Sequence, residues 1–228
     1  ALDTTTNAFT GAVTITTNDN SGTDADVTID GGTTALILAA STIDGDLTVR
    51  SGNASGITDS GTVTVGGNLA ATTDAANGVI NLGTLAVDGT VALTTHGSGN
   101  ATVVNDAGLT FAASTVGGNF AATATTDANN GLINLGTLAV DGTVQLTTNG
   151  SGNATVVNDA GLNFAASTVG GVLNATATTG NMTDSGALTI AGTSSFTTSA
   201  NNATIALDTT TNAFTGAVTI TTNDNSGT

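Results

Sequence analysis

Apolar residues alternate with threonine, serine and asparagine along many short segments of this chain, and glycine separates the segments. Clear examples are GAVTITT from Gly11, TVTVGGNLAATT from Thr62 and ALTIAGT from Ala187. A period of two is typical of strands with one buried face, and glycine favours the turns between them. The pattern therefore predicts an all-β fold of short strands, and its regularity argues against a disordered chain.

The sequence repeats at three lengths. The 23 residues that begin at Ala1 recur unchanged from Ala206, which gives a period of 205 residues. Residues 78–130 and 131–183 are near-identical copies, each 53 residues long. We expect residues 1–205 to form one full period and residues 206–228 to start the next, so that the chain is a window cut from a longer array. In the shortest repeat a glycine precedes each new strand, and these glycines are Gly11, Gly45, Gly67, Gly89, Gly118, Gly142, Gly171, Gly192 and Gly216.

The shortest repeat predicts the architecture. Its units average about 26 residues, which fits one coil of a parallel β-solenoid with three short strands and three corners. In residues 89–117, for example, TVALTT, ATVVN and LTFAAST would be the strands, with HGSGN and DAG as corners between them. A propeller blade is longer and usually carries aromatic signatures that this chain lacks. We expect about eight coils per 205-residue period.

Alignment on the glycines produces columns of similar residues. The second and fourth positions after each glycine are mostly apolar, and we expect them to point inward and to form stacks along the whole rod. The fifth position is threonine with one exception and predicts an outward ladder. The second position is occupied by Val13, Leu47, Leu69, Val91, Phe120, Val144, Leu173 and Ser194. The fourth is occupied by Ile15, Val49, Ala71, Leu93, Ala122, Leu146, Ala175 and Phe196. The fifth is occupied by Thr16, Arg50, Thr72, Thr94, Thr123, Thr147, Thr176 and Thr197.

The amino-acid composition limits the classes of partner that we expect this protein to bind. All 17 acidic residues are aspartate, against one arginine and no lysine, so the net charge is −16. Phosphate groups and anionic membranes are bound by clustered basic residues, and we therefore expect no nucleic-acid partner and no docking on lipid. No apolar run approaches the ~20 residues of a membrane helix, so we also expect no membrane insertion. Proline is absent, in agreement with strands that are paired on both sides.

Candidate chemistry is sparse. Carbohydrate-cleaving β-helices need clustered carboxylates with basic residues and often aromatic platforms, whereas this chain has one His, one Arg and no Trp or Tyr. We expect no enzyme activity, no catalytic residues and no cofactor. His96 is replaced by Asn149 in the second 53-residue copy, which indicates a solvated corner residue. Arg50 is expected to pair with a surface aspartate.

One acidic segment could bind a cation. Asp19, Asp24, Asp26 and Asp30 lie close together in the sequence, and carboxylate oxygens at this density could hold Ca²⁺. The nonapeptide of calcium-binding β-rolls and the EF-hand pattern are both missing. An exposed acidic loop is therefore the favoured interpretation, with Ca²⁺ ligation at 19–30 as the alternative.

An ice-binding surface is a further alternative, since flat arrays of paired threonines can bind ice. It requires a second threonine column beside the predicted ladder. Three positions after the glycines the residues are mixed, and the double row is not maintained; they are Thr14, Thr48, Ala70, Ala92, Ala121, Gln145, Asn174 and Ser195.

Three segments carry a family resemblance. ITDSGTVTVGGNLAATT from Ile57, MTDSGALTIAGTSSFTT from Met182 and FTGAVTITT from Phe9 resemble the repeat region of filamentous-haemagglutinin-like proteins, the giant exported bacterial surface proteins that include two-partner-secretion adhesins. The resemblance implies a right-handed parallel β-helix, secretion across the outer membrane, and a role as a stalk, fibre or adhesin. It supplies no functional residues.

Together these observations predict a structural shaft segment of an extracellular filament at the bacterial cell surface. Its expected partner is the protein itself, through end-to-end continuation and lateral bundling. An adhesin that binds surface glycans along its repeats is the alternative function.

Overall fold

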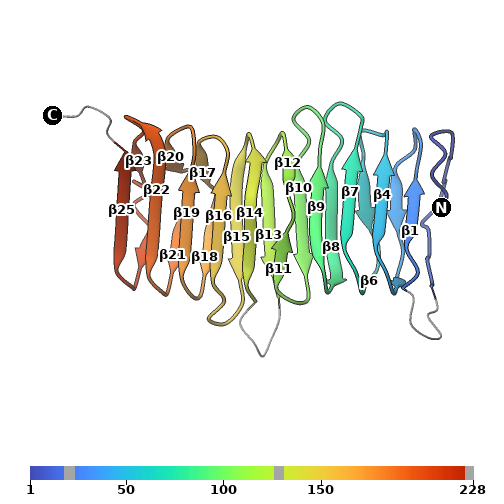
Figure 1. Ribbon diagram of the computed structural model, residues 1–228, viewed down its shortest axis with the longest axis horizontal. Helices are drawn as coiled ribbons and strands as arrows, with labels where there is room; N and C mark the ends of the chain where they lie inside the picture. Colours follow the sequence, from blue (N-terminus) through green and yellow to red (C-terminus); the bar gives the residue numbers. More distant parts are fainter. Residues whose placement is uncertain (18–23, 126–130, 224–228) are drawn as a thin grey trace.

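The computed structural model describes residues 1–17, 24–125 and 131–223 of the chain. These ranges contain 25 strands and no helix, so they hold no helical segment that could cross a membrane. The strands pair in parallel and stack into a rod (Figure 1). The predicted all-β parallel β-solenoid is therefore confirmed.

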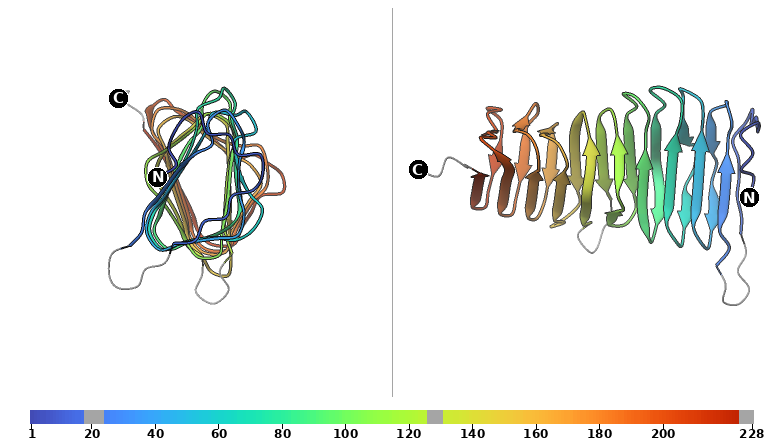
Figure 2. Two further views of the ribbon diagram at one scale, coloured as in Figure 1. Left: turned by 90° about the vertical axis from the view of Figure 1, so that its right-hand side faces the viewer. Right: turned by 45° about the horizontal axis from the view of Figure 1, so that its top comes forward.

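Two sheets form the walls of the solenoid, and the end-on view shows the turns overlying one another in one elongated outline (Figure 2). The first sheet contains β1 (Val27–Asp30), β4 (Leu47–Ser51), β7 (Leu69–Thr73), β9 (Thr90–Thr94), β11 (Leu109–Phe111), β12 (Ser114–Val116), β14 (Ile133–Val140), β16 (Ala154–Asn158), β19 (Leu173–Ala177), β22 (Ser194–Asn201) and β25 (Val218–Asn223). The second contains β2 (Leu36–Leu38), β3 (Ser41–Ile43), β5 (Ile57–Asp59), β6 (Val63–Val65), β8 (Ile80–Val87), β10 (Ala101–Asn105), β13 (Phe120–Ala124), β15 (Thr143–Thr148), β17 (Leu162–Phe164), β18 (Ser167–Val169), β20 (Met182–Asp184), β21 (Leu188–Ile190), β23 (Ile205–Ala206) and β24 (Ala213–Phe214).

The chain crosses the two sheets alternately, so each turn uses both walls. Toward either end a turn has three strands, as in β4, β5 and β6, because the second wall is bent between two short strands. At β8 the second wall is a single strand that pairs with both β5 and β6, so the turn of β7 and β8 has two strands. Further along, the first wall is divided between β11 and β12.

The core lies between the two walls and is filled by the predicted inward columns. Every residue of these two columns is buried except Val13, which is half-buried. Large side chains from opposite walls meet inside: Phe111 and Phe120 pack edge to face with ring centroids 5.3 Å apart. Phe164 and Phe196 do the same at 6.3 Å. Such pairs keep a narrow core filled where the opposite position is small.

The expectation of about eight coils was too low, because the glycines do not mark one coil each. From β1 to β25 the first sheet alone records nine turns. Between Gly89 and Gly118 the chain runs through β9, β10 and β11–β12 and then enters β13 on the second wall, which is one and a half turns. A glycine-marked unit of 29 residues therefore ends on the wall opposite to the one where it began.

The predicted stacks consequently do not run along the whole rod. Leu47 and Leu69 are parallel partners on the first sheet. Phe120 and Val144 continue the same sequence column on the second sheet, and Leu173 returns it to the first. The prediction that these side chains point inward was correct. The prediction that they form one continuous stack was wrong, because the column moves from one sheet to the other.

Candidate functional site

Side chains at the corners connect successive turns. An Asp or Asn at a corner, directly after a glycine or, for Asp26, after an alanine, accepts a hydrogen bond from a backbone N–H of the next turn. Asp46 Oδ1 accepts from the N–H of Asn68 at 2.7 Å, and Asn68 Oδ1 accepts from that of Thr90 at 2.9 Å. We call this set the corner ladder, and its members are Asp26, Asp46, Asn68, Asn100, Asn119 and Asn153.

The corner ladder explains the glycine column. A Cβ on Gly67 would collide with Asp46 Oδ1, and a Cβ on Gly118 would collide with Asn100 Oδ1. Neither glycine has a positive φ, so the requirement is space and not an unusual backbone conformation. Each glycine leaves room for the side chain that holds the turn below in register.

Arg50 lies on the outer face of the first sheet, between Asp30 of β1 and Thr72 of β7. Its Nε donates to Asp74 Oδ2 and lies 3.9 Å from Asp30 Oδ2. The hydrogen bond and the negative charge of Asp74 raise the pKa of Arg50 above its ordinary value. The predicted pairing with a surface aspartate is present, and it links three successive turns.

Replacing Arg50 by glutamine is expected to change the free energy of unfolding by less than about 1 kcal/mol, because half of the side chain is exposed and water screens the pair. Urea unfolding at low and high salt would measure this, with Thr94→Gln on the same outer column as control. A loss above about 3 kcal/mol would contradict the expectation and identify Asp30 as a buried charge that depends on Arg50.

The acidic segment does not form a visible cation site. Asp19 lies outside the described residues, and Asp24 is exposed. Asp26 Oδ1 accepts the N–H of Asp46 at 2.8 Å, and Asp30 Oδ1 accepts that of Gly32 at 2.7 Å. Across the described ranges no group of three or more His, Cys, Asp or Glu could hold a metal ion. Ca²⁺ ligation at 19–30 stays a prediction without support from these contacts.

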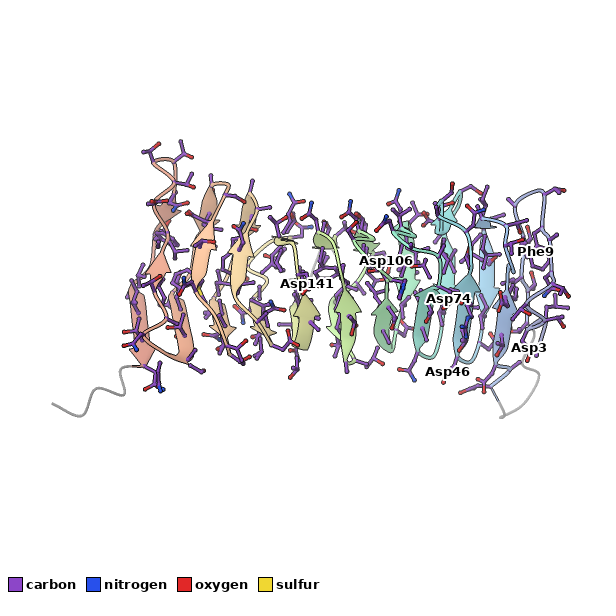
Figure 3. All side chains as sticks on the ribbon, turned by 90° about the horizontal axis from the view of Figure 1, so that it is seen from above. Asp3, Phe9, Asp46, Asp74, Asp106 and Asp141 are labelled. Carbon is purple, nitrogen blue, oxygen red and sulfur yellow. The ribbon has the colours of Figure 1, made fainter. Side chains whose placement is uncertain are left out.

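Other aspartates are spread out. Those labelled in Figure 3 follow one another along the rod and do not gather on one part of it. His96 is exposed at its corner, as expected, and its carbonyl oxygen accepts the N–H of Asn77 at 2.8 Å.

Two buried asparagines were not predicted. Asn105 is 0% exposed and Asn158 is 1% exposed. Each Oδ1 accepts a backbone N–H, of Val87 at 2.8 Å and of Val140 at 2.9 Å respectively. Both are the last residue of ATVVN, and strict alternation along that strand places them inward with the buried alanine and valine. The alternation was therefore the signal that could have found them.

The outward threonine ladder changes wall as the core columns do. Thr176, Thr197 and Thr221 are successive partners on the first sheet. Thr123 and Thr147 are partners on the second. The first sheet carries Ala139 and Val157 on its outer face between its threonine runs, and these interrupt the regular array that ice binding would need.

Comparison with protein families identifies the family to which this chain belongs. The model of a family described as "Repeats of unknown function (DUF5649)" matches residues 24–82 and 151–221, which is more than half of the chain. The chain belongs to the DUF5649 repeat family. Each matched DUF5649 segment includes a turn of three strands, β4–β6 in the first and β19–β21 in the second. No curated protein and no solved structure matches the chain.

Proposed function

We propose that this DUF5649 repeat chain is a segment of the shaft of a long extracellular filament on a bacterial surface. The observation that carries the proposal is continuity: parallel ladders run from β1 to β25, and the same core and corner contacts recur at turn after turn. A rod of this kind is long and stiff, because each turn contacts its neighbours above and below.

Composition supports an exposed setting. One arginine and no lysine leave trypsin-like proteases almost no cleavage site. The net charge of −16 keeps rods soluble and apart, and divalent cations could bridge them into bundles. The resemblance of the Ile57 and Met182 segments to haemagglutinin-like repeats supports secretion to the cell surface.

The proposal is tested by electron microscopy of the native material together with antibody labelling of intact cells. We expect labelled filaments with a spacing of about 4.8 Å along the axis. Deleting one 205-residue period should shorten the filament by about 45 Å and leave its assembly intact. Discrete globular particles, or antigen confined to the cell interior, would contradict the proposal.

An adhesin is the second candidate, and one observation favours it. Asn163 lines a hollow of about 330 Å³ together with Asp141, Asn181 and Thr183, and its buried Oδ1 accepts no hydrogen bond from the described residues. Such groups suit the hydroxyls of a glycan. The period deletion separates the two functions, because a shaft loses length alone whereas an adhesin loses ligand bound per filament.

A further inference from the structure

The segment that occurs twice in the sequence lies on opposite walls of the rod. Leu2 pairs with Ile29 at the first sheet, whereas its copy Leu207 lies between β23 and β24 of the second. Val13 pairs with Leu38 of β2 on the second sheet, whereas its copy Val218 begins β25 on the first. Identical residues thus occupy both walls.

The local conformation of the segment is the same in both places. The N–H of Asn7 donates to the carbonyl of Thr4 at 2.9 Å, and that of Asn212 donates to the carbonyl of Thr209 at 3.0 Å. The side-chain amides of the two asparagines donate to the carbonyls of Leu2 and Leu207 respectively. The turn is therefore set by the segment itself, and either wall accepts it because both are parallel ladders with the same spacing.

The number of turns explains the exchange of walls. Nineteen half-turns separate Leu2 from Leu207, so one 205-residue period contains nine and a half turns. The 53-residue duplication behaves in the same way, since INLGTLAV forms β8 on the second sheet and β14 on the first. The 205-residue period and the 53-residue copy therefore both contain a half-integral number of turns. The walls alternate in the order β1, β2–β3, β4, β5–β6, β7, β8, β9, β10, β11–β12, β13, β14, β15, β16, β17–β18, β19, β20–β21, β22, β23–β24 and β25.

The last turn exposes apolar residues that the first turn covers. Val218 and Ile220 of β25 are 42% and 59% exposed. The copy of Val218, Val13, is half-buried, and the copy of Ile220, Ile15, is 9% exposed. The N–H of Ile15 donates to Ser41 Oγ of β3 at 3.0 Å. The structure therefore contains the cover for β25: it is the stretch formed by β2 and β3, supplied by a second copy of the same sequence.

We propose that the shared segment, described at 1–17 and 206–223, is the joint between successive periods and sets them half a turn apart. The second-sheet strands β2 and β3 of one period then stack on β25, which belongs to the first sheet of the period before it. Every surface group of one period recurs on the opposite wall of the next, about 45 Å along the axis. The shaft presents the same surface to partners on both sides and repeats fully after two periods. This inference rests on the proposed function, because a joint requires that several periods follow one another in the same shaft.

The joint can be tested by cross-linking in a two-period chain, residues 1–205 followed directly by residues 1–228. The chain has no cysteine, so introduced thiols react without background. In the proposed joint, Thr197 of the first period lies two strands below Thr42 of the second, with the copy of Thr221 between them. Thr197→Cys with Thr42→Cys in the second period should be joined by a bismaleimide of about 10 Å, which spans two strand spacings.

The matched control places the second cysteine at Thr48 of the second period, an exposed residue of the first sheet, which the joint puts on the far wall. We expect a cross-link with Thr42 and none with Thr48. Thr176→Cys with Thr221→Cys in the single chain must react, because these residues are two strands apart on the first sheet. A link with Thr48 in place of Thr42, links in both pairs, or no link in either pair would overturn the joint. Mass spectrometry of the purified chain reads the result, so absence of filaments from the cell surface would contradict the proposed function alone.

Discussion

Replacing Gly118 by alanine is expected to lower the free energy of unfolding by about 3 kcal/mol. The new Cβ would collide with Asn100 Oδ1 and lie 2.8 Å from the carbonyl oxygen of Gly99. That carbonyl cannot move away freely, because it accepts the N–H of Gly118 itself at 3.0 Å. The strain falls on the ladder that holds two turns together. Urea unfolding followed by far-ultraviolet circular dichroism measures the loss.

Gly83→Ala is the matched control. A Cβ on Gly83 meets nothing closer than Asp59 Oδ1 at 3.8 Å, and its φ is not positive. The free energy of unfolding should change by no more than about 0.5 kcal/mol. Equal losses in the two variants would show that glycine is required for backbone freedom everywhere, and the explanation of the glycine column by space at the corner ladder would be wrong.

The period-two alternation was sufficient to predict the strands and the inward direction of residues such as Leu69 and Leu146, because burial of one face dictates that pattern. It could not predict which wall a strand joins. Both walls are parallel ladders with the same spacing, and a segment such as INLGTLAV satisfies either one. From the spacing of the glycines alone, a unit that makes one and a half turns was therefore predicted to be one coil.

The contacts at the corners were harder still to predict. The sequence pattern did not single out Asp46 or Asn68, because their partners lie about one turn away in the sequence and depend on the register between turns. Asp30 was grouped with its sequence neighbours as a possible Ca²⁺ ligand, whereas the fold turns its carboxylate toward Gly32 and Arg50. Proximity in sequence is a poor guide where contacts run between coils.

Replacing Asn158 by leucine is expected to lower the free energy of unfolding by about 4 kcal/mol. Asn158 Nδ2 donates to the carbonyls of Val140 at 3.0 Å and Gly161 at 2.6 Å, while its Oδ1 accepts the N–H of Val140. The side chain thus replaces ladder bonds at the end of β16, just beyond the last paired residues, Leu138 and Asn158. Leucine has a similar volume but would remove the side-chain partner of two buried backbone groups of Val140 and of the half-buried Gly161 carbonyl. Each buried group left without a partner costs about 1–3 kcal/mol.

Asn174→Thr on β19 is the control for this substitution, since Asn174 is exposed and threonine suits a strand. Its free energy of unfolding should stay within about 0.5 kcal/mol of the unmodified chain. Hydrogen exchange adds a local measurement, because the Val140 amide should lose protection in Asn158→Leu before the rest of the rod does. If Asn158→Leu were as stable as the unmodified chain, the buried amide would not be needed to hold the end of β16 to β14, and packing between the walls would be sufficient there.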